Sequence, residues 1–380
     1  MTRAPIPITE PSFDETEIEA IRAVLGSKWV TQGPQTEKFE QQIAAFCGAR
    51  HVFATTSATA ALHLAAAALD LGPGDEVIVP AFTWVTSAYA VEYVGASARL
   101  VDVDPSTFNL DPAKIEAAVT ARTKAVIAVH LFGLAAPMNA ILDIARRRGL
   151  RVIEDAACAI GTTLGGRPVG VLGDIGCFSF HPRKIVTTGE GGAATTNDAA
   201  LATKLRYLRN HGATGLPDAA LEPHGPWTMA TFEALGFNLR FSDIQAAIGV
   251  AQMAKLPRLL AERRARARRY FELLAPFHDL ALPSADAGHT YQSYVIRVAA
   301  GGRARRNKAM AAMAAEGIQT RPGTHAIHRL GYLRRKYGWR PEDFPCAAAA
   351  EDETITLPIV PGMTDADQDR VVSVLKKGLA

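Results

Sequence analysis

The sequence predicts a two-part α/β protein whose larger, N-terminal part is built on a mostly parallel sheet. Three observations lead to this fold class. The chain has 380 residues, which suits one large domain and one smaller domain. Short runs of β-branched residues alternate with Ala- and Leu-rich stretches over its first two-thirds. From about Ser242 onward, this alternation gives way to a long helical stretch followed by an α+β pattern.

The alternating region predicts strand–helix–strand units in order along the chain. We expect strands at 51–55, 76–80, 98–103, 124–132 and 151–155, and helices that begin near 59 and lie near 84–93, 112–120 and 137–148. Because a helix crosses over between consecutive strands at this spacing, the strands should run parallel. Their sequences are continuous apolar runs, which is typical of a sheet covered by helices on both faces.

The C-terminal third predicts a second, smaller domain. A long helical stretch over 242–274, interrupted at Pro257, leads into strands at 291–299 and 355–359 and helices at 307–317 and 364–378. We therefore expect a large α/β domain over residues 1–250 and a small C-terminal α+β domain over residues 251–380. The arginine-rich run at 262–270 falls within this amphipathic helix and is interpreted as a solvated face, not as a nucleic-acid site.

The composition argues against several classes of protein. A formal net charge of +3 at pH 7 is small for this length and indicates neither nucleic-acid nor membrane binding. The four cysteines are far apart and form no CxxC pair, which indicates reduced thiols and neither a disulfide framework nor a metal site. No apolar run approaches the roughly 18–20 residues of a membrane span, and the N-terminus lacks the apolar core of a signal peptide. We therefore expect a cytoplasmic protein without a metal.

Two residues carry the chemistry that the sequence suggests. Asp155 follows the apolar run RVI, at the sheet edge where open α/β sheets bind ligands, although a helix cap or a solvated acid explains it equally well when taken alone. Lys184 lies in FSFHPRKIVTTGEGG, where Pro182 prevents a regular helix and the glycines let the backbone turn close to a bulky ligand. Its apolar and small neighbours favour a partly desolvated amine that attacks a carbonyl carbon over an ordinary surface lysine.

Two further segments indicate the kind of ligand. Ser57, Ala58 and Thr59 stand at a strand-to-helix junction, where backbone N–H groups and the helix dipole bind phosphates, although such residues are usually only caps. Trp84 follows a strand end, where it either stacks on a flat heteroaromatic ring or belongs to the core. A phosphate site, a stacking ring, a carboxylate for a pyridinium nitrogen and a lysine for an aldehyde are together what pyridoxal 5′-phosphate requires.

Essentially end to end, the sequence resembles the DegT/StrS-type sugar aminotransferases, a fold-type I family of pyridoxal-phosphate enzymes. The resemblance rests on PAFTWVTSAYAVEYVGA, VIEDAACAIG, GCFSFHPRKIVTTGEGG, LRNHGA and GFNLRFSDIQAAIG, which occur in the family's order. It implies a mostly parallel, seven-stranded central sheet with helices on both faces in a large cofactor-binding domain. A homodimer with two shared active sites is also implied.

The resemblance assigns the reacting groups first. Lys184 matches the Schiff-base lysine, which also moves the proton during transamination. Asp155 matches the carboxylate that keeps the pyridine nitrogen protonated, so that the ring serves as an electron sink. Trp84 matches the residue that stacks on the ring.

Other matched residues are implied to hold the rest of the cofactor. Ala58, Thr59 and Ser179 match phosphate contacts, and Asn238 matches an asparagine that reaches the phosphate from the neighbouring subunit. Cys158 stands where many members have Gln or His near the cofactor's 3-hydroxyl. A thiol is a weaker hydrogen-bond partner than either of those side chains.

The substrate side of the site departs most from the family pattern. His181 and Arg183 replace the aromatic and small polar residues that commonly precede the lysine. They are candidate substrate contacts, and the alternative for Arg183 is an exposed side chain without a role in the site. His325, in RPGTHAIH, lies near a position where the family has a substrate-side histidine. Arg321 and Tyr291 are further candidates.

The resemblance implies transfer of an amino group from an amino acid, glutamate or glutamine, to a keto-sugar linked to a nucleotide. Related enzymes that dehydrate keto-sugars carry His in place of the lysine, so Lys184 argues against that chemistry. Amination of a keto-cyclitol is an alternative that the sequence leaves open. A non-catalytic regulator that retains the fold is a second alternative, against which the intact lysine segment speaks.

Overall fold

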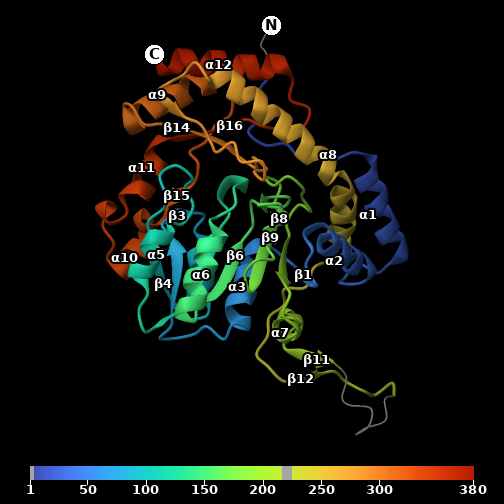
Figure 1. Ribbon diagram of the computed structural model, residues 1–380. Helices are drawn as coiled ribbons and strands as arrows, with labels where there is room; N and C mark the ends of the chain where they lie inside the picture. The colour runs from blue at the N-terminus through green and yellow to red at the C-terminus, as the bar shows by residue number, and fades with distance from the viewer. Residues whose placement is uncertain (1–3, 216–224) are drawn as a thin grey trace.

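A seven-stranded sheet forms the centre of the N-terminal part, in the order β1-β10-β9-β6-β5-β2-β4 (Figure 1). The computed structural model describes residues 4–215 and 225–380. The strands are β1 (His51–Thr55), β2 (Glu76–Pro80), β4 (Ser97–Val101), β5 (Thr123–Val129), β6 (Arg151–Asp155), β9 (Ile175–Ser179) and β10 (Gly192–Thr196). β10 runs antiparallel to both of its neighbours, and the other adjacent strands are parallel. The predicted mostly parallel, seven-stranded sheet is therefore confirmed.

Helices cover both faces of this sheet. Successive strand residues point to opposite sides, so each strand packs its side chains against helices on both faces. Val77 and Val79 share one face and pack with residues of α3 (Ala58–Ala68), α4 (Thr86–Tyr93) and α7 (Ala199–Arg209). Ile78 points to the other face and packs with residues of α5 (Pro112–Ala118) and α6 (Met138–Arg148). On that same side Phe178 packs with α2 (Pro34–Cys47). Apolar strands buried on both sides are what the sequence predicts.

One long helix, α8 (Asp243–Leu274), runs from the large sheet into the C-terminal part (Figure 1). Its first half packs against α1 (Glu15–Ser27) and α2, and its second half contributes Tyr270 and Leu274 to another core. The predicted interruption at Pro257 is wrong, since the helix continues through this residue. A proline removes one backbone N–H and crowds the preceding turn. Here the buried side chains of Leu256 and Leu259 hold both turns against the core.

The C-terminal part has its own core around a three-stranded antiparallel sheet. Its elements are β13 (Leu280–Ala281), β14 (Tyr294–Val298), α9 (Gly302–Ala315), β15 (His325–Ala326), α10 (Gly331–Tyr337), α11 (Pro345–Glu353), β16 (Thr354–Leu357) and α12 (Asp365–Leu379). β15 lies outside this sheet and pairs with β3 (Phe82–Thr83) of the large part. Ile6, near the start of the chain, also belongs to the C-terminal core. We propose a division near residue 250, with this N-terminal segment packed on the smaller domain.

Two short hairpins lie outside these sheets. β7 (Thr163–Leu164) pairs with β8 (Arg167–Pro168), and β11 (Ala213–Gly215) pairs with β12 (Thr231–Phe232). The β11–β12 hairpin projects away from the rest of the chain (Figure 1). Within residues 4–215 and 225–380, no helix combines the length and the apolar character needed to cross a bilayer.

Candidate active site

A cavity of about 740 Å³ opens at the carboxyl ends of the parallel strands. Val129, Asp155 and Ser179, the last residues of β5, β6 and β9, line its floor together with the start of α3. Residues of the C-terminal part, Arg321 and His325 among them, line it from the other side. Its volume lies within the range of small-molecule sites, and its place is the one where open α/β sheets bind ligands.

Asp155 presents a buried carboxylate to this cavity. Its Oδ2 accepts a hydrogen bond from Oγ of Ser87 at 2.7 Å, and its Oδ1 accepts one from the backbone N–H of Ala157 at 3.2 Å. In the part of the chain that the structure describes, no Lys, Arg or His side chain forms an ion pair with it. A buried carboxylate with only neutral donors fits a cationic group on a ligand.

Ser87 is a member of the site that sequence reasoning missed. It lies on α4, is fully buried, and is within 3.1 Å of the hydroxyl of Thr83 while it bonds to Asp155. It is part of PAFTWVTSAYAVEYVGA, one of the segments that carry the resemblance and the one that contains Trp84. The sequence gives no sign that this serine faces β6, because the contact depends on how α4 packs on the sheet.

Lys184 extends into the cavity from an irregular loop between β9 and β10. The backbone N–H of Lys184 bonds to the carbonyl of His181 at 2.8 Å, and that of Thr188 bonds to Phe180 at 3.0 Å, so the segment is a series of turns, as its proline predicts. Nζ of Lys184 donates to Sγ of Cys158 at 3.0 Å. The structure thus brings the predicted nucleophile, Cys158 and Asp155 to one cavity.

The start of α3 presents backbone N–H groups on the same floor. Oγ of Ser57 accepts from the backbone N–H of Ala60, and the helical ladder begins with the N–H of Ala61, which leaves the N–H groups of Ala58 and Thr59 for a ligand. Ser179 is brought beside them because it pairs with Gly192.

Gly192 makes this close approach possible. A Cβ on this residue would lie 2.3 Å from the carbonyl carbon of Ser57 and 2.5 Å from the nitrogen of Ala58. Only glycine therefore allows β10 to run directly against the first residue of α3. The glycine cluster after Lys184 was predicted to accommodate a bulky ligand, and at Gly192 its observed role is to bring backbone segments together.

Trp84 and His325 form the cavity wall opposite the sheet. Trp84 is 56% exposed and is not a core residue, and its ring lies 5.5 Å from that of His325. The pairing of β3 with β15 brings the two side chains together. His325 also has its Nδ1 within 3.7 Å of Glu351. His181 lines the same cavity, and burial lowers the pKa of its imidazole.

Two candidates lie outside the cavity of this single chain. Asn238 pairs through its backbone with Asn210 and is absent from the cavity lining. Tyr291 stacks on His289 with 4.0 Å between the ring centroids, and its hydroxyl donates to the carbonyl of Ser284. The suggestion that Tyr291 contacts the substrate is therefore wrong for this chain's cavity, because the residue packs in the C-terminal core.

Taken together, the cavity fits pyridoxal phosphate on its own geometry. It has a lysine amine, a buried carboxylate without a cationic partner among the described residues, free N–H groups at a helix start and an exposed indole. Each of these matches a different part of the cofactor, namely the aldehyde, the ring nitrogen, the phosphate and the ring face.

Comparisons with known proteins agree with this geometry. Residues 11–376 match the model of the DegT/DnrJ/EryC1/StrS aminotransferase family. The chain is 39% identical to GDP-perosamine synthase of Caulobacter vibrioides, over 98% of both chains. It is 37% identical to the spore coat polysaccharide biosynthesis protein SpsC of Bacillus subtilis, over 98% of this chain and 96% of that protein.

Solved structures give the same result. A putative sugar aminotransferase, Spr1654 from Streptococcus pneumoniae in its PMP form, superposes with a TM-score of 0.93 at 28% identity, over 98% of this chain and 99% of that one. DesV of S. venezuelae, in complex with a ketimine intermediate, superposes with a TM-score of 0.89 at 31% identity, over 99% and 98% of the two chains.

Proposed function

This chain belongs to the DegT/DnrJ/EryC1/StrS aminotransferase family, and we propose that it carries the amino group of glutamate or glutamine to a keto-sugar linked to a nucleoside diphosphate. It is a pyridoxal-phosphate-dependent sugar aminotransferase. The observation that carries the proposal is the placement of the Lys184 amine and the Asp155 carboxylate in one cavity with the start of α3. The nucleotide follows from the relative named GDP-perosamine synthase, whose name denotes a GDP-linked product.

When bound, pyridoxal phosphate supplies an aldehyde carbon that bonds to amines and a ring that accepts electrons from the adjacent carbon. We assign the phosphate to the N–H groups of Ala58 and Thr59 and the hydroxyl of Ser179. The carboxylate of Asp155 holds a proton on the ring nitrogen, with Ser87 fixing its orientation. Trp84, which lines the cavity and is exposed, would lie against one face of the ring.

Lys184 serves both half-reactions. Its Nζ would hold the cofactor through the aldehyde carbon and, with the donor's amino group in its place, would take up the proton from the donor's α-carbon. The same Nζ acts in the reverse direction when the keto-sugar takes up the amino group. The contact to Cys158 holds the amine on the cavity side of the loop. Cys158 is the residue that we assign beside the cofactor's 3-hydroxyl.

The donor and the reaction are tested with the purified protein loaded with pyridoxal phosphate. We expect L-glutamate or L-glutamine to convert the absorbance of the bound aldehyde form to that of the amine form. Nucleotide-linked keto-sugars, GDP-linked ones first, should then restore the aldehyde absorbance. Lys184→Ala should abolish both changes, whereas Lys28→Ala, at an exposed surface lysine, should leave them intact. A spectrum of the wild-type protein that changes with neither of the two donors would contradict the proposal.

We further propose a homodimer in which Asn238 completes the partner's site. Asn238 lies outside the cavity of its own chain. The polypeptide just before it carries highly exposed apolar side chains, with Trp227 76%, Met229 79% and Leu235 92% exposed. Apolar surface of this kind indicates an interface with another protein surface.

Hybrid dimers test the shared site. Mixed subunits that carry either Lys184→Ala or Asn238→Ala should form a hybrid with one site in which both residues are intact. Activity above that of either variant alone is the expected result. A monomer by analytical ultracentrifugation, or mixing without recovery of activity, would contradict the shared site.

A further inference from the structure

Two of the arginines that line the active-site cavity differ from the others. Arg303 pairs with Asp352, and Arg306 donates to the carbonyl oxygens of Glu351 and Thr354, so these guanidinium groups are used within the fold. Arg183 and Arg321 line the same cavity. Within residues 4–215 and 225–380, neither of their side chains forms an ion pair with a carboxylate.

Arg321 is the more unusual of the two. Its Nε is buried and has no hydrogen-bond partner among the described residues, which is costly for a charged group. Burial and the nearby charge of Arg183 lower its pKa. The backbone of Arg321 is fixed, since its carbonyl accepts from the N–H of Thr356 at 2.7 Å. The guanidinium is therefore held in a place where none of the described residues provides a counter-ion.

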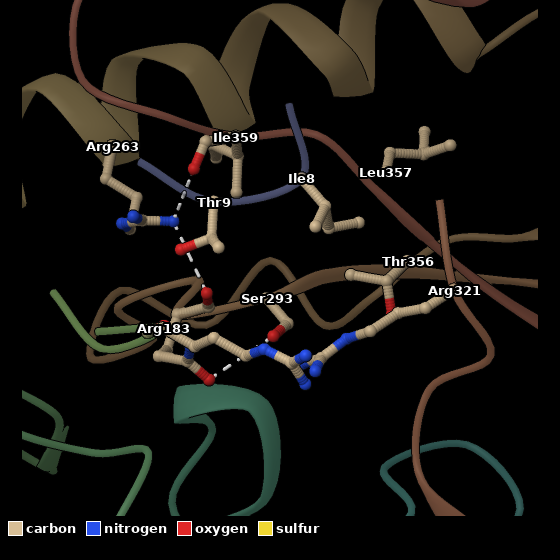
Figure 2. Close-up of a pocket in the computed structure, with 10 residues that line it drawn as sticks. Ile8, Thr9, Arg183, Arg263, Ser293, Arg321, Thr356, Leu357 and Ile359 are labelled. Atoms are coloured by element: carbon tan, nitrogen blue, oxygen red, sulfur yellow. Dashed lines mark hydrogen bonds between the residues drawn. The ribbon is translucent and has the colours of Figure 1, made fainter. Parts of the chain in front are cut away.

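Arg183 approaches the same space from the other domain. Figure 2 shows both guanidinium groups reaching toward one another beside Ser293, in a smaller hollow that adjoins the cavity. The amide of Gln292 donates to the carbonyl of Arg183 at 2.7 Å and fixes its backbone. Two like charges converge here without a carboxylate between them.

We propose that Arg183 and Arg321 form an oxyanion site that binds the α-carboxylate of the amino-acid donor. This assignment rests on the proposed function and names a subsite of it. A planar carboxylate accepts paired hydrogen bonds from a guanidinium, and two such groups offset the repulsion that they otherwise suffer.

The position of the pair favours a carboxylate over the phosphates of a nucleotide-linked sugar. Arg183 directly precedes Lys184, whose amine removes the proton of the donor's α-carbon in the proposed reaction. The α-carboxylate is bonded to that same carbon. A diphosphate lies beyond the sugar ring, and therefore farther from the reacting atom. The cofactor's phosphate is already accounted for by the start of α3.

The test measures binding, not turnover, in the protein loaded with pyridoxal phosphate. The first probe is 2-methyl-L-glutamate, which has no α-proton and cannot be transaminated, and the second is GDP. Isothermal titration gives a dissociation constant for each. Arg321→Gln should weaken the binding of 2-methyl-L-glutamate about 10- to 100-fold, the loss expected for hydrogen bonds between charged groups, and should leave that of GDP within about twofold. Arg183→Gln, at an exposed position, should give a smaller change of the same kind.

Arg335→Gln is the matched control, because this arginine is exposed on α10, away from the cavity. It should change neither constant. Unchanged binding of 2-methyl-L-glutamate in both cavity variants overturns the carboxylate site, and so does a loss of GDP binding that equals or exceeds it. If the wild-type protein itself binds neither 2-methyl-L-glutamate nor 2-methyl-L-glutamine, the proposed amino-acid donor fails, and the carboxylate site with it.

Discussion

Glu154 and Asp155 are neighbours at the end of β6, yet the two carboxylates lie in opposite surroundings. Because successive strand residues point to opposite faces, Asp155 reaches the cavity and Glu154 points away from it. Glu154 accepts hydrogen bonds from the backbone N–H groups of Gly170, Leu172 and Gly173. Its Oε2 also lies 2.9 Å from Nε2 of His130.

The difference shows how one strand serves both stability and chemistry. Nδ1 of His130 accepts from the N–H of Ala136, so the ring donates to Glu154 through Nε2. Both carboxylate oxygens of Glu154 accept hydrogen bonds from groups of the protein, so none of its hydrogen bonds depends on a ligand. Asp155 has Ser87 and one backbone N–H, with its remaining capacity directed at the cavity. A completed network anchors the loop before β9, whereas an incomplete one is available to a ligand.

The largest effect should come from Asp155→Asn. The amide cannot hold a proton on the ring nitrogen through a charge, so turnover should fall about 10²- to 10³-fold, as for the loss of a preorganised electrostatic group. Without cofactor, the free energy of unfolding should stay the same or rise, because a buried charge without a cation is removed. Steady-state kinetics and urea denaturation of the cofactor-free protein measure the two quantities. Full activity of this variant would show that the charge of Asp155 is not needed for the reaction.

Glu154→Gln should lower the stability of the protein and leave its turnover nearly unchanged, the opposite of Asp155→Asn. The amide nitrogen would face backbone N–H donors from which Glu154 now accepts hydrogen bonds, and the buried carboxylate that these donors stabilise would be gone. We expect a loss of about 3 kcal/mol in the free energy of unfolding, with turnover per folded molecule nearly unchanged. Denaturation and activity assays with saturating cofactor separate these outcomes. A variant as stable as the wild type would show that the network does not anchor the loop.

The same network predicts a pH dependence of stability. Burial raises the pKa of Glu154, but the hydrogen bonds from His130 and from the backbone N–H groups outweigh it, so the pKa lies below its ordinary value of 4.5. A depressed pKa means that the stabilisation is complete above pH 4.5 and is lost as the pH falls toward the folded-state value. Unfolding free energies of Glu154→Gln should therefore fall less steeply with acid than those of the wild type. Parallel curves for the two proteins would contradict this origin.

Much of the fold follows from the sequence, because β-branched runs alternate with Ala- and Leu-rich stretches and so indicate the strand–helix–strand units. β6 begins and ends where its apolar run predicts, at Arg151 and Asp155. The antiparallel insertion of β10 between β1 and β9 was not predicted, since strand order depends on long-range pairing and not on local pattern. The interruption expected at Pro257 failed for a related reason, because tertiary packing kept the helix continuous.

The residues of the site fall into the same two groups, those that a local sequence pattern indicates and those that depend on long-range contacts. Lys184, Asp155 and the start of α3 come from segments whose local pattern indicates a turn, a strand end or a helix start, and the structure brings them together. Ser87 and the pairing of Trp84 with His325 depend on contacts between distant segments, which no local pattern specifies. The sequence therefore indicated which residues carry charge or nucleophilicity, and the fold determined which neutral groups support them.

The smallest predicted effect tests whether such a supporting group matters. Ser87→Ala removes the 2.7 Å hydrogen bond to Asp155 and leaves the carboxylate with one backbone donor. Turnover should fall about five- to tenfold, which corresponds to a hydrogen bond of about 1 to 1.4 kcal/mol. The affinity for pyridoxal phosphate should weaken by a similar factor, because the same carboxylate binds the ring nitrogen. Ser373→Ala, at an exposed serine of α12, is the control and should change neither quantity. If Ser87→Ala lowers stability but leaves turnover and cofactor affinity intact, Ser87 belongs with Glu154 among the anchors of the fold and not with Asp155 in the site.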